Sequence, residues 1–404
     1  MENKKVPQLR FRGFEDEWEE KKLGEVSDRV TRKNENLDSK LPLTISAQYG
    51  LVDQITFFNN QVASVTNLKN YFLLEKGEFA YNKSYSAGYP WGAIKRLDRY
   101  EKGVLSTLYI VFKPKKINSD YLVAYYDTTN WHKQVSEIAA EGARNHGLLN
   151  IAPNDFFQIT FLAPKSGKEQ RKIGSFLSKI DSLIQAKTQK LERLKAVKKS
   201  LLQKCFPKDG EKVPEIRFAG FSGDWEENKL GDFGEVCMCK RIFKEQTSLT
   251  ESIPFYKIGT FGSEADAYIS RDLFEYYKTH YPYPKTGTIL ISASGSLGRT
   301  VVYEGKEEYF QDSNIVWLEH NEKISDSFLK IFYDFVEWNG IEGTTIKRLY
   351  NSIILKQKIM VPSIDEQQKI GQFFSKYDSL IILQQKEIDN LKTIKKSLLQ
   401  KMFV

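Results

Sequence analysis

Residues 169–184 read EQRKIGSFLSKIDSLI, and residues 366–381 repeat them almost letter for letter as EQQKIGQFFSKYDSLI. In each copy apolar side chains follow at intervals of four and three residues, which is the seven-residue repeat of a coiled-coil seam. Because a single helix with such a seam would expose it to water, we expect the two helices to pair with each other. The seam positions are Ile173, Leu177, Ile180, Ile184, Leu191, Leu194 and Leu201, then Ile370, Phe374, Tyr377, Ile381, Ile388, Leu391 and Leu398.

Polar residues interrupt both seams at matching places, namely Lys187, Lys198, Gln384 and Lys395. A second repeat precedes the inserts: VPQLRFRGFEDEWEEKKLGEV begins at Val6, and VPEIRFAGFSGDWEENKLGDF begins at Val213. The segments between the repeats differ in length and in sequence. A repeated frame with unlike inserts indicates that the frame assembles something, while each insert recognises something different.

The composition is that of a folded protein with a basic balance. The chain has 404 residues, of which 41% are hydrophobic and 13% aromatic, enough for two globular domains with full cores. The net charge of +8 favours a polyanionic partner, above all nucleic acid. Residues 165–208 contain thirteen lysines and arginines but only three acidic residues. This run suits the solvated face of a coiled coil, and it equally suits a rod that lies near DNA phosphates.

Several functional classes find no support in the sequence. The three cysteines and four histidines do not have the spacing of a metal site, and so low a cysteine count suits a reducing cytoplasm. The charged N-terminus does not resemble a signal peptide, and no apolar run reaches the length that spans a membrane. The segment GSLGRT lacks the spacing and the lysine of a phosphate-binding loop, and no nucleophile elbow, zinc-protease motif or methyltransferase NPP[FY] motif is present.

The first insert, about residues 20–160, mixes short strands and helices. LYIVFK (108–113) and FFQITFLAP (156–164) are strand-like, and YLVAYYDTTNW (121–131) reads as a helix. The segment FAYNKSYSAGYPWGAIKRL (79–97) has the composition of a loop with interleaved aromatic and basic residues. Such a loop suits entry into a DNA groove, although a turn region with packed aromatics has the same composition. Its candidate DNA contacts are Lys83, Tyr85, Tyr89, Trp91, Lys95 and Arg96.

Three further segments supply candidate DNA contacts. EGARNHGLLNI (141–151) offers Arg144, Asn145 and His146, which have side chains suited to bidentate base contacts, although an ordinary turn would also use its glycines. In the second insert, about 232–358, the segment 287–305 reads as strand, loop, strand. GTTIKRLY (343–350) occupies the place that GARNHG holds in the first half. Their candidates are Ser292, Ser294, Arg299, Lys347 and Arg348.

Two variable inserts separated by two repeated helices, with EQRKI and EQQKI starts, WEE openings at Trp18 and Trp225 and SLLQK endings at Ser200 and Ser397, closely resemble the specificity subunit of type I restriction-modification enzymes. The resemblance covers the whole chain. It implies a mixed α/β (α+β) fold with a pseudo-twofold internal repeat, in which two long helices form an antiparallel coiled coil. The implied parts are target-recognition domains at 1–164 and 211–361 and helices at 165–210 and 362–404.

The resemblance also implies the function and the partners. Each target-recognition domain would read one half of a bipartite, asymmetric site in double-stranded DNA, and the chain itself would carry no catalyst. The paired helices would set the gap between the half-sites and dock two modification subunits. These would carry S-adenosylmethionine and methylate adenine, and two restriction subunits would use ATP and Mg²⁺. No membrane is involved, and the complex is expected in the cytoplasm.

The helices are expected to act as a ruler between the half-sites. A helix from about residue 168 to 206 would be roughly 58 Å long at 1.5 Å per residue. At about 3.4 Å per base pair, this length allows the half-site centres to lie at most about 17 base pairs apart. Two other hypotheses stay open, a coiled-coil scaffold that binds nucleic acid without sequence preference and a self-contained DNA methyltransferase. The first predicts a steep salt dependence for every DNA, and the second predicts cofactor binding by the isolated chain.

Overall fold

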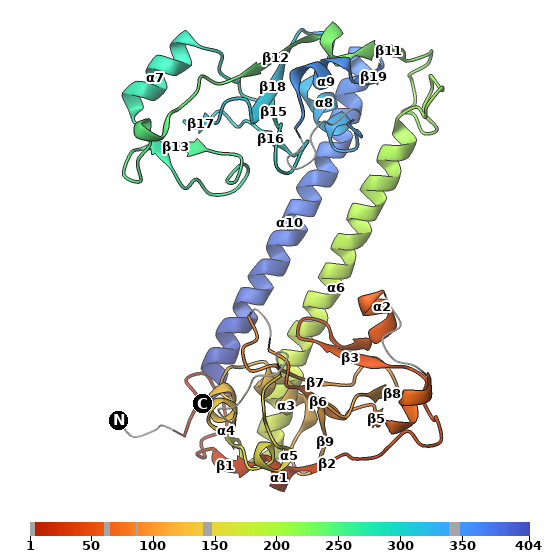
Figure 1. Ribbon diagram of the computed structural model, residues 1–404, viewed down its shortest axis with the longest axis vertical. Helices are drawn as coiled ribbons and strands as arrows, with labels where there is room; N and C mark the ends of the chain where they lie inside the picture. The colour runs from red at the N-terminus through yellow and green to blue at the C-terminus, as the bar shows by residue number, and fades with distance from the viewer. Residues whose placement is uncertain (1–4, 60–64, 86–87, 140–147, 339–347) are drawn as a thin grey trace. The chain divides into compact units, whose positions relative to one another are not determined.

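The computed structural model of the chain describes residues 5–59, 65–85, 88–139, 148–338 and 348–404 (Figure 1). It divides into two compact units: unit 1 comprises Met1–Thr188 and Lys386–Val404, and unit 2 comprises Gln189–Gln385. Each unit therefore contains a piece of both long helices, α6 (Gly167–Cys205) and α10 (Ile364–Met402). The first helix was expected over about 168–206, and the structure confirms it to within one residue at each end.

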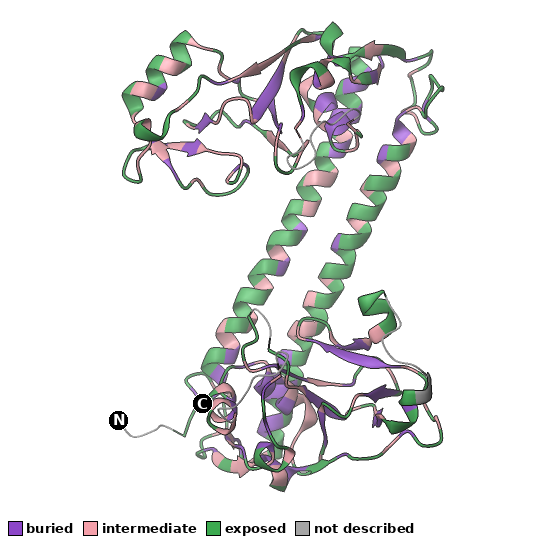
Figure 2. Cartoon of the chain, viewed as in Figure 1, coloured by how far each residue is buried: buried purple, intermediate pink, exposed green. Residues whose placement is uncertain are grey.

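The seam positions of both helices are buried or half-buried without exception, and buried positions recur at intervals along each helix (Figure 2). The pairing is antiparallel within unit 1. Lys187 Nζ lies 2.6 Å from Glu387 Oε2, and Asp181 Oδ1 lies 2.6 Å from the ammonium of Lys395. Because residue numbers rise along α6 as they fall along α10, the predicted antiparallel coiled coil is confirmed.

The polar interruptions of the seam differ in how they are satisfied. In unit 2, Lys198 Nζ lies 2.6 Å from Asp378 Oδ1, so three of the four interrupting residues reach a carboxylate of the opposite helix. The fourth, Gln384, is 5% exposed, and its side-chain nitrogen has no hydrogen-bond partner among the described residues. A buried amide nitrogen without a partner opposes folding.

Unit 1 contains short strands and helices ahead of α6. Its elements are β1 (Glu19–Lys22), α1 (Leu23–Val26), β2 (Ser27–Arg29), β3 (Leu43–Ser46), β4 (Gly50–Asp53), α2 (Gln54–Phe58), η1 (Val65–Asn70), β5 (Phe72–Glu75), β6 (Phe79–Asn82), β7 (Ala93–Arg96), β8 (Lys102–Leu105), β9 (Ile110–Pro114), α3 (Ser119–Tyr126), α4 (His132–Ile138), α5 (Pro153–Phe156) and β10 (Thr160–Ala163).

The main sheet of unit 1 is antiparallel, with strand order β2-β9-β6-β7. Three strand pairs, β1 with β10, β3 with β4 and β5 with β8, lie beside it in the described part of the unit. The largest core packs the sheet residues Phe79 and Phe112 against α3, the start of α6 and the end of α10. Phe403, just beyond α10, contacts Trp18 and Tyr121 edge-on or tilted in this core.

Unit 2 repeats this plan with different elements. They are β11 (Glu226–Lys229), η3 (Leu230–Asp232), β12 (Gly234–Met238), η4 (Lys244–Gln246), β13 (Ile253–Tyr256), β14 (Tyr268–Ile269), α7 (Arg271–His280), β15 (Ile289–Ser292), β16 (Thr300–Val302), β17 (Tyr309–Phe310), β18 (Ile315–His320), α8 (Asp326–Tyr333), α9 (Asn351–Lys356) and β19 (Lys358–Val361).

The main sheet of unit 2 is also antiparallel, with order β12-β18-β15-β16. Its core packs Ile291 and Val316 against α8, the end of α6 and the start of α10. Strand β13 pairs with β14 and, in parallel, with β17, and these strands and α7 surround a second core that includes Phe274 and Trp317.

The repeated frame makes the same buried ion pair in both units. The guanidinium of Arg10 binds both carboxylate oxygens of Glu169 at 2.7 and 2.9 Å, and the guanidinium of Arg217 binds both oxygens of Glu366 at 2.8 and 2.7 Å. Both glutamates are 1% exposed. A two-point arginine clamp fixes orientation as well as distance, so the pair joins the segment before each insert to the first turn of each long helix.

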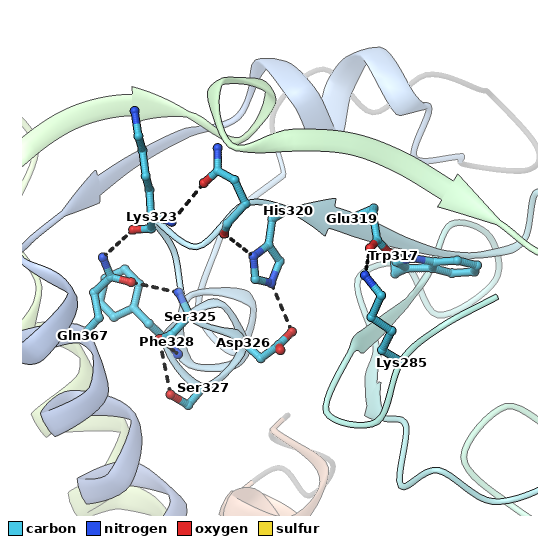
Figure 3. A network of polar contacts seen from close by, with 11 residues as sticks. Lys285, Trp317, Glu319, His320, Lys323, Ser325, Asp326, Ser327, Phe328 and Gln367 are labelled. Carbon is cyan, nitrogen blue, oxygen red and sulfur yellow. Dashed lines mark hydrogen bonds and ion pairs between the residues drawn. The ribbon is translucent and has the colours of Figure 1, made fainter. Parts of the chain in front are cut away.

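A glutamine on each long helix holds the N-cap residue of the helix that packs against it, α3 in unit 1 and α8 in unit 2. Gln367 Oε1 accepts a hydrogen bond from the backbone N–H of Ser325 at 3.0 Å, while its Nε2 donates to the carbonyls of Lys323 and Pro362 (Figure 3). In unit 1, Gln170 Oε1 accepts from Asn118 N–H at 3.0 Å. Asn118 and Ser325 are the N-cap residues of α3 and α8, so each glutamine holds the residue that begins a core helix.

A glycine on each long helix permits this close packing. A Cβ on Gly174 would lie 2.6 Å from the backbone nitrogen of Tyr121, at the start of α3. A Cβ on Gly371 would lie 3.2 Å from the carbonyl carbon of Ser327 and closer to its side chain. Both distances are shorter than those of ordinary carbon contacts, so the long helices approach α3 and α8 more closely than a larger residue would permit.

Three predicted elements in unit 1 need new bounds. The strand predicted at 108–113 is β9, at 110–114, and the helix predicted over 121–131 ends at Tyr126 before α4 begins at His132. Of the strand-like segment 156–164, only 160–163 forms a strand. Phe156, at the start of that segment, is instead the last residue of α5, because Pro153 at the first helical position favours a helix there.

Candidate nucleic-acid interface

The segment 79–97, predicted as a loop, is a β-hairpin in the structure. Strands β6 and β7 pair from Phe79 with Arg96 to Asn82 with Ala93, which leaves 83–92 as the connecting loop. The prediction was wrong about the ends of this segment because Phe79, Ala80 and Tyr81 are all buried. A strand buried on both faces lacks the alternation of polar and apolar residues that usually reveals a strand.

The hairpin loop of unit 1 exposes two of its candidate aromatic side chains. Tyr85 is 43% exposed and Tyr89 is 40% exposed, whereas Trp91 is half-buried against the core. Lys83 is also half-buried, with Nζ 3.4 Å from the carbonyl of Ile151, and burial lowers the pKa of its ammonium group. The loop therefore presents tyrosines outward, with hydroxyl groups that can donate or accept hydrogen bonds.

A second chain segment joins this loop. Ser84 forms a β-bridge with Leu148, and the N–H of Leu149 donates to the carbonyl of Lys83 at 2.9 Å. The candidates Arg144, Asn145 and His146 lie outside the described residues. The contact with the hairpin loop is therefore made by Leu148 and Leu149, at the described end of the segment 141–151.

The corresponding hairpin of unit 2 is formed by β15 and β16, with a loop at 293–299. Ser292 is 1% exposed, and its hydroxyl donates to the carbonyl of Ser296 and accepts from the N–H of Arg299. The hydroxyl of Ser294 bonds the side-chain oxygen of Asn314 at 2.8 Å. These serines brace the loop from within, while Arg299 is exposed on it, with Nη2 3.2 Å from the carbonyl of Gly262.

The segment before α9 meets the unit 2 loop in the same way. Ser294 forms a β-bridge with Arg348, and the N–H of Leu349 donates to the carbonyl of Ala293 at 2.9 Å. Arg348 is half-buried and lies 5.8 Å from the ring of Tyr350, which is 46% exposed. Tyr350 was not among the candidates predicted from the sequence, although it lies two residues after Arg348. Lys347 lies outside the described residues.

Two of the candidate cations already have carboxylate partners. Lys95 Nζ lies 2.8 Å from Asp127 Oδ1, and the guanidinium of Arg96 lies 2.7 Å from both Asp98 and Asp120. The geometry gives these two residues of β7 a role in holding the hairpin, and a DNA contact by either of them stays a prediction.

The described residues offer little for other kinds of site. In the ranges given above, no group of histidine, cysteine, aspartate or glutamate side chains could hold a metal ion. Within the same ranges, every helix is too short or too polar to cross a membrane.

Comparison with known proteins places both halves of the chain in one family. The family model described as type I restriction modification DNA specificity domain matches residues 15–196 and again 222–393. A putative type I restriction enzyme specificity subunit from Haemophilus influenzae is 52% identical over 153 residues, which are 38% of this chain and 40% of that protein. The match thus spans less than half of that relative.

More distant relatives align over more of the chain. The MjaVIII type I restriction enzyme specificity subunit from Methanocaldococcus jannaschii is 22% identical over 322 residues, or 74% of this chain and 73% of that protein. The crystal structure of a type I restriction-modification S subunit from M. genitalium aligns over 99% of both chains, with a TM-score of 0.64 and 17% identity. A chain from a type I restriction-modification complex aligns over 96% and 97%, with a TM-score of 0.53 and 16% identity. The structural matches show a shared fold.

Proposed function

Because the chain belongs to the family of type I restriction-modification DNA specificity proteins, we propose that it is the DNA sequence-recognition subunit of such a complex. Each unit reads one half of a bipartite, asymmetric DNA site, and the chain itself is not catalytic. One observation carries this proposal. In each unit a hairpin loop is hydrogen-bonded to a second segment, which precedes α5 in unit 1 and α9 in unit 2. The backbone arrangement is the same in both units, but the side chains on these loops differ.

The side chains of these loops suit direct readout of bases. In unit 1 they include the exposed Tyr85 and Tyr89, and the sequence adds the candidates Arg144, Asn145 and His146. In unit 2 they include Arg299, Arg348 and Tyr350. An arginine can donate two hydrogen bonds to guanine, and exposed aromatic rings contact bases or sugars. Because the two sets differ, the two half-sites differ, and the complete site is not palindromic.

The repeated frame supports two copies of one protein partner. Val6 and Leu9 in unit 1 are 37% and 42% exposed, and the corresponding Val213 and Ile216 in unit 2 are 44% and 42% exposed. Exposed apolar side chains that are duplicated together with the frame favour two equivalent docking surfaces. We assign them to two modification subunits, which carry S-adenosylmethionine. Two restriction subunits with ATP and Mg²⁺ complete the cytoplasmic complex.

The helix pair sets the spacing between the half-sites in this proposal. Inserting one helical turn, four residues or about 6 Å, into either long helix is expected to lengthen the unread gap and to leave both half-sites unchanged. A changed half-site would contradict the ruler.

The first experiment is a genome-wide map of adenine methylation, by single-molecule sequencing, in cells with and without this chain. Loss of one bipartite, gapped motif on deletion is expected. An unchanged map in cells with active partner subunits, or DNA binding that depends on salt and not on sequence, would instead support a scaffold. The complex with Arg299→Ala should alter the motif in one half only, whereas Lys102→Ala, which changes an exposed residue of β8, should leave both halves unchanged.

A further inference from the structure

A chain of ion pairs in unit 1 connects the helix pair to the hairpin that carries the reading loop. Lys395 of α10 has Nζ 2.7 Å from Asp127 Oδ2 and 2.6 Å from the carboxylate of Asp181 on α6. The other oxygen of Asp127 lies 2.8 Å from Lys95 Nζ on β7. A single carboxylate, at the residue that follows α3, therefore holds one cation from the helix pair and one from the hairpin.

These groups are largely shielded from water. The exposed fractions of the side chains are 19% for Asp127, 25% for Lys95 and 15% for Lys395. Burial alone would raise the pKa of Asp127, but the two ammonium groups hold it below its ordinary value of 3.8. The carboxylate is therefore ionised at neutral pH, and solvent and salt screen its ion pairs less than they screen exposed ones.

The neighbouring residue adds a second attachment of the same strand. Arg96 Nη1 lies 2.8 Å from the hydroxyl of Ser119 and 2.7 Å from Asp120, both in the first turn of α3. Strand β7 is thus bound by side chains to the first turn of α3 and to the residue just beyond its last turn.

Among the described residues of unit 2, the matching network does not reach the hairpin. Lys198 takes the place of Lys395, with Nζ 2.8 Å from Asp334 Oδ2 and 2.6 Å from Asp378 Oδ1. The other oxygen of Asp334 binds Lys330, which lies on α8 itself. The hairpin strand β16 reads TVV and has no charged side chain to contribute.

We propose that Lys95 is a positioning residue for DNA reading, which fixes the β6–β7 hairpin to the helix pair of unit 1 through Asp127. This inference rests on the proposed function, in which the loop of this hairpin reads one half-site. Direct readout requires side chains to be held close to one geometry. A hairpin without this attachment adopts more positions, and its loop then tolerates wrong bases. Discrimination in unit 2 does not depend on such a tie.

The variant Lys95→Met tests the inference in the assembled complex. It keeps most of the aliphatic stem, removes the charge, and leaves Lys395 with both of its carboxylates. Lys330→Met is the matched control, because it also takes one lysine from a shared aspartate but leaves the unit 2 hairpin untouched. Lys95→Arg should retain the wild-type behaviour.

Methylation of sites with one mismatched base, measured by single-molecule sequencing, is the first readout. Tyr89→Ala identifies the half-site that unit 1 reads. In Lys95→Met, mismatched sites in that half should be methylated roughly threefold to tenfold more, relative to correct sites, and mismatches in the other half should be unaffected. Equal relaxation of both halves, no relaxation, or the same effect from Lys330→Met would overturn the inference. If the wild-type complex methylates no bipartite motif, it is the proposed function that fails.

Hydrogen exchange on the purified complex gives a readout that does not depend on DNA. Backbone amides of residues 79–97 should exchange several-fold faster in Lys95→Met, while those of 289–302 keep their wild-type rates. If the variant complex unfolds as a whole, Lys95→Gln replaces it. Unchanged exchange at 79–97 in a folded variant would show that the ion pair does not hold the hairpin.

Discussion

Unit 1 and unit 2 make the same frame contacts but attach their hairpins differently. Arg10 with Glu169 and Arg217 with Glu366 form matching buried ion pairs. The attachments of the hairpins differ, because Lys95 and Arg96 tie β7 to the two ends of α3, whereas β16 carries no charged residue. The residues that are repeated in the sequence thus include those that join each insert to its long helix. The inserts differ in the loops that would read DNA and also in the side-chain ion pairs that hold each hairpin.

The largest expected effect tests whether the two frames are equivalent. Arg217→Met leaves the carboxylate of Glu366 charged, buried and unpaired, and breaking such a pair costs about 3–5 kcal/mol of folding free energy. Arg10→Met should cost unit 1 a similar amount through Glu169. Thermal unfolding combined with hydrogen exchange assigns each loss to its unit, with the exposed Arg12→Met as control. A large loss in one unit and none in the other would break the equivalence.

A smaller effect is expected where the long helices pack against α3 and α8. Gly174→Ala and Gly371→Ala each place a methyl group against the start of the neighbouring helix, and such overpacking costs about 1–3 kcal/mol. Gly167→Ala is the matched control, because its added methyl group would meet only Arg171 Nη1, at 3.7 Å. Midpoints of chemical unfolding measure all three variants. If Gly174→Ala were as stable as the control, the close approach in unit 1 would be wrong.

The seam itself should respond unequally in the two copies. Gln384→Leu removes a buried amide nitrogen that lacks a partner and should stabilise unit 2 by about 1 kcal/mol. Lys187→Leu, at the corresponding position in the first copy, removes the ion pair with Glu387 and should lower stability by less than about 1 kcal/mol. Melting temperatures of the two variants should therefore move in opposite directions, and a lower melting temperature for Gln384→Leu would contradict this reading.

The smallest effect concerns pH. Asp326 of unit 2 is paired with His320 at 3.2 Å (Figure 3). Asp120 of unit 1 is paired with Arg96 instead. The hydrogen bond to Asp326 raises the pKa of His320 above its ordinary value of 6.5. The stabilisation is therefore complete below pH 6.5 and is lost as the pH rises through the raised pKa.

We expect a loss of no more than about 1 kcal/mol from unit 2, since Asp326 is partly exposed. Denaturant unfolding from pH 6 to pH 9, compared between wild type and His320→Gln, measures it. Unit 1 should show no matching dependence, because its arginine stays charged throughout this range. If the free energy of unfolding depended on pH in the same way in wild type and in His320→Gln, the predicted contribution of His320 would be wrong.

The helices and the duplicated segments could be predicted because each produces a pattern in the sequence, a periodic one for the helices and a repeated one for the segments. The seven-residue spacing marks each seam, and the match from Val6 to Val213 marks the shared openings. The hairpin strands were missed because β6 is buried on both faces. Lys95 and Arg96 were assigned to DNA from their composition alone. Arg96 also pairs with the nearby Asp98, but the partners that tie the hairpin down, Asp127 and Asp120, lie more than twenty residues away. Pairing over such a distance leaves no local pattern in the sequence.

The candidate site could be predicted to the level of segments and not of side chains. In each insert the structure pairs the hairpin loop with the described end of the second proposed segment, through the bridges of Ser84 with Leu148 and Ser294 with Arg348. It also turns Ser292 inward, which its place among glycines and serines did not indicate. Whether a side chain braces a loop or faces outward depends on hydrogen bonds within the folded loop, so composition alone does not reveal it.

The assignment of α10 to both units has a consequence for the order of events during synthesis on the ribosome. Unit 2 is one continuous stretch, Gln189–Gln385, whereas the core of unit 1 includes Leu399, Met402 and Phe403. The nascent first insert therefore waits for residues made after the whole of unit 2 before its core is complete. Until then Trp18 and Tyr121 lack the contact with the ring of Phe403, and we expect the unfinished unit to expose apolar surface that favours aggregation.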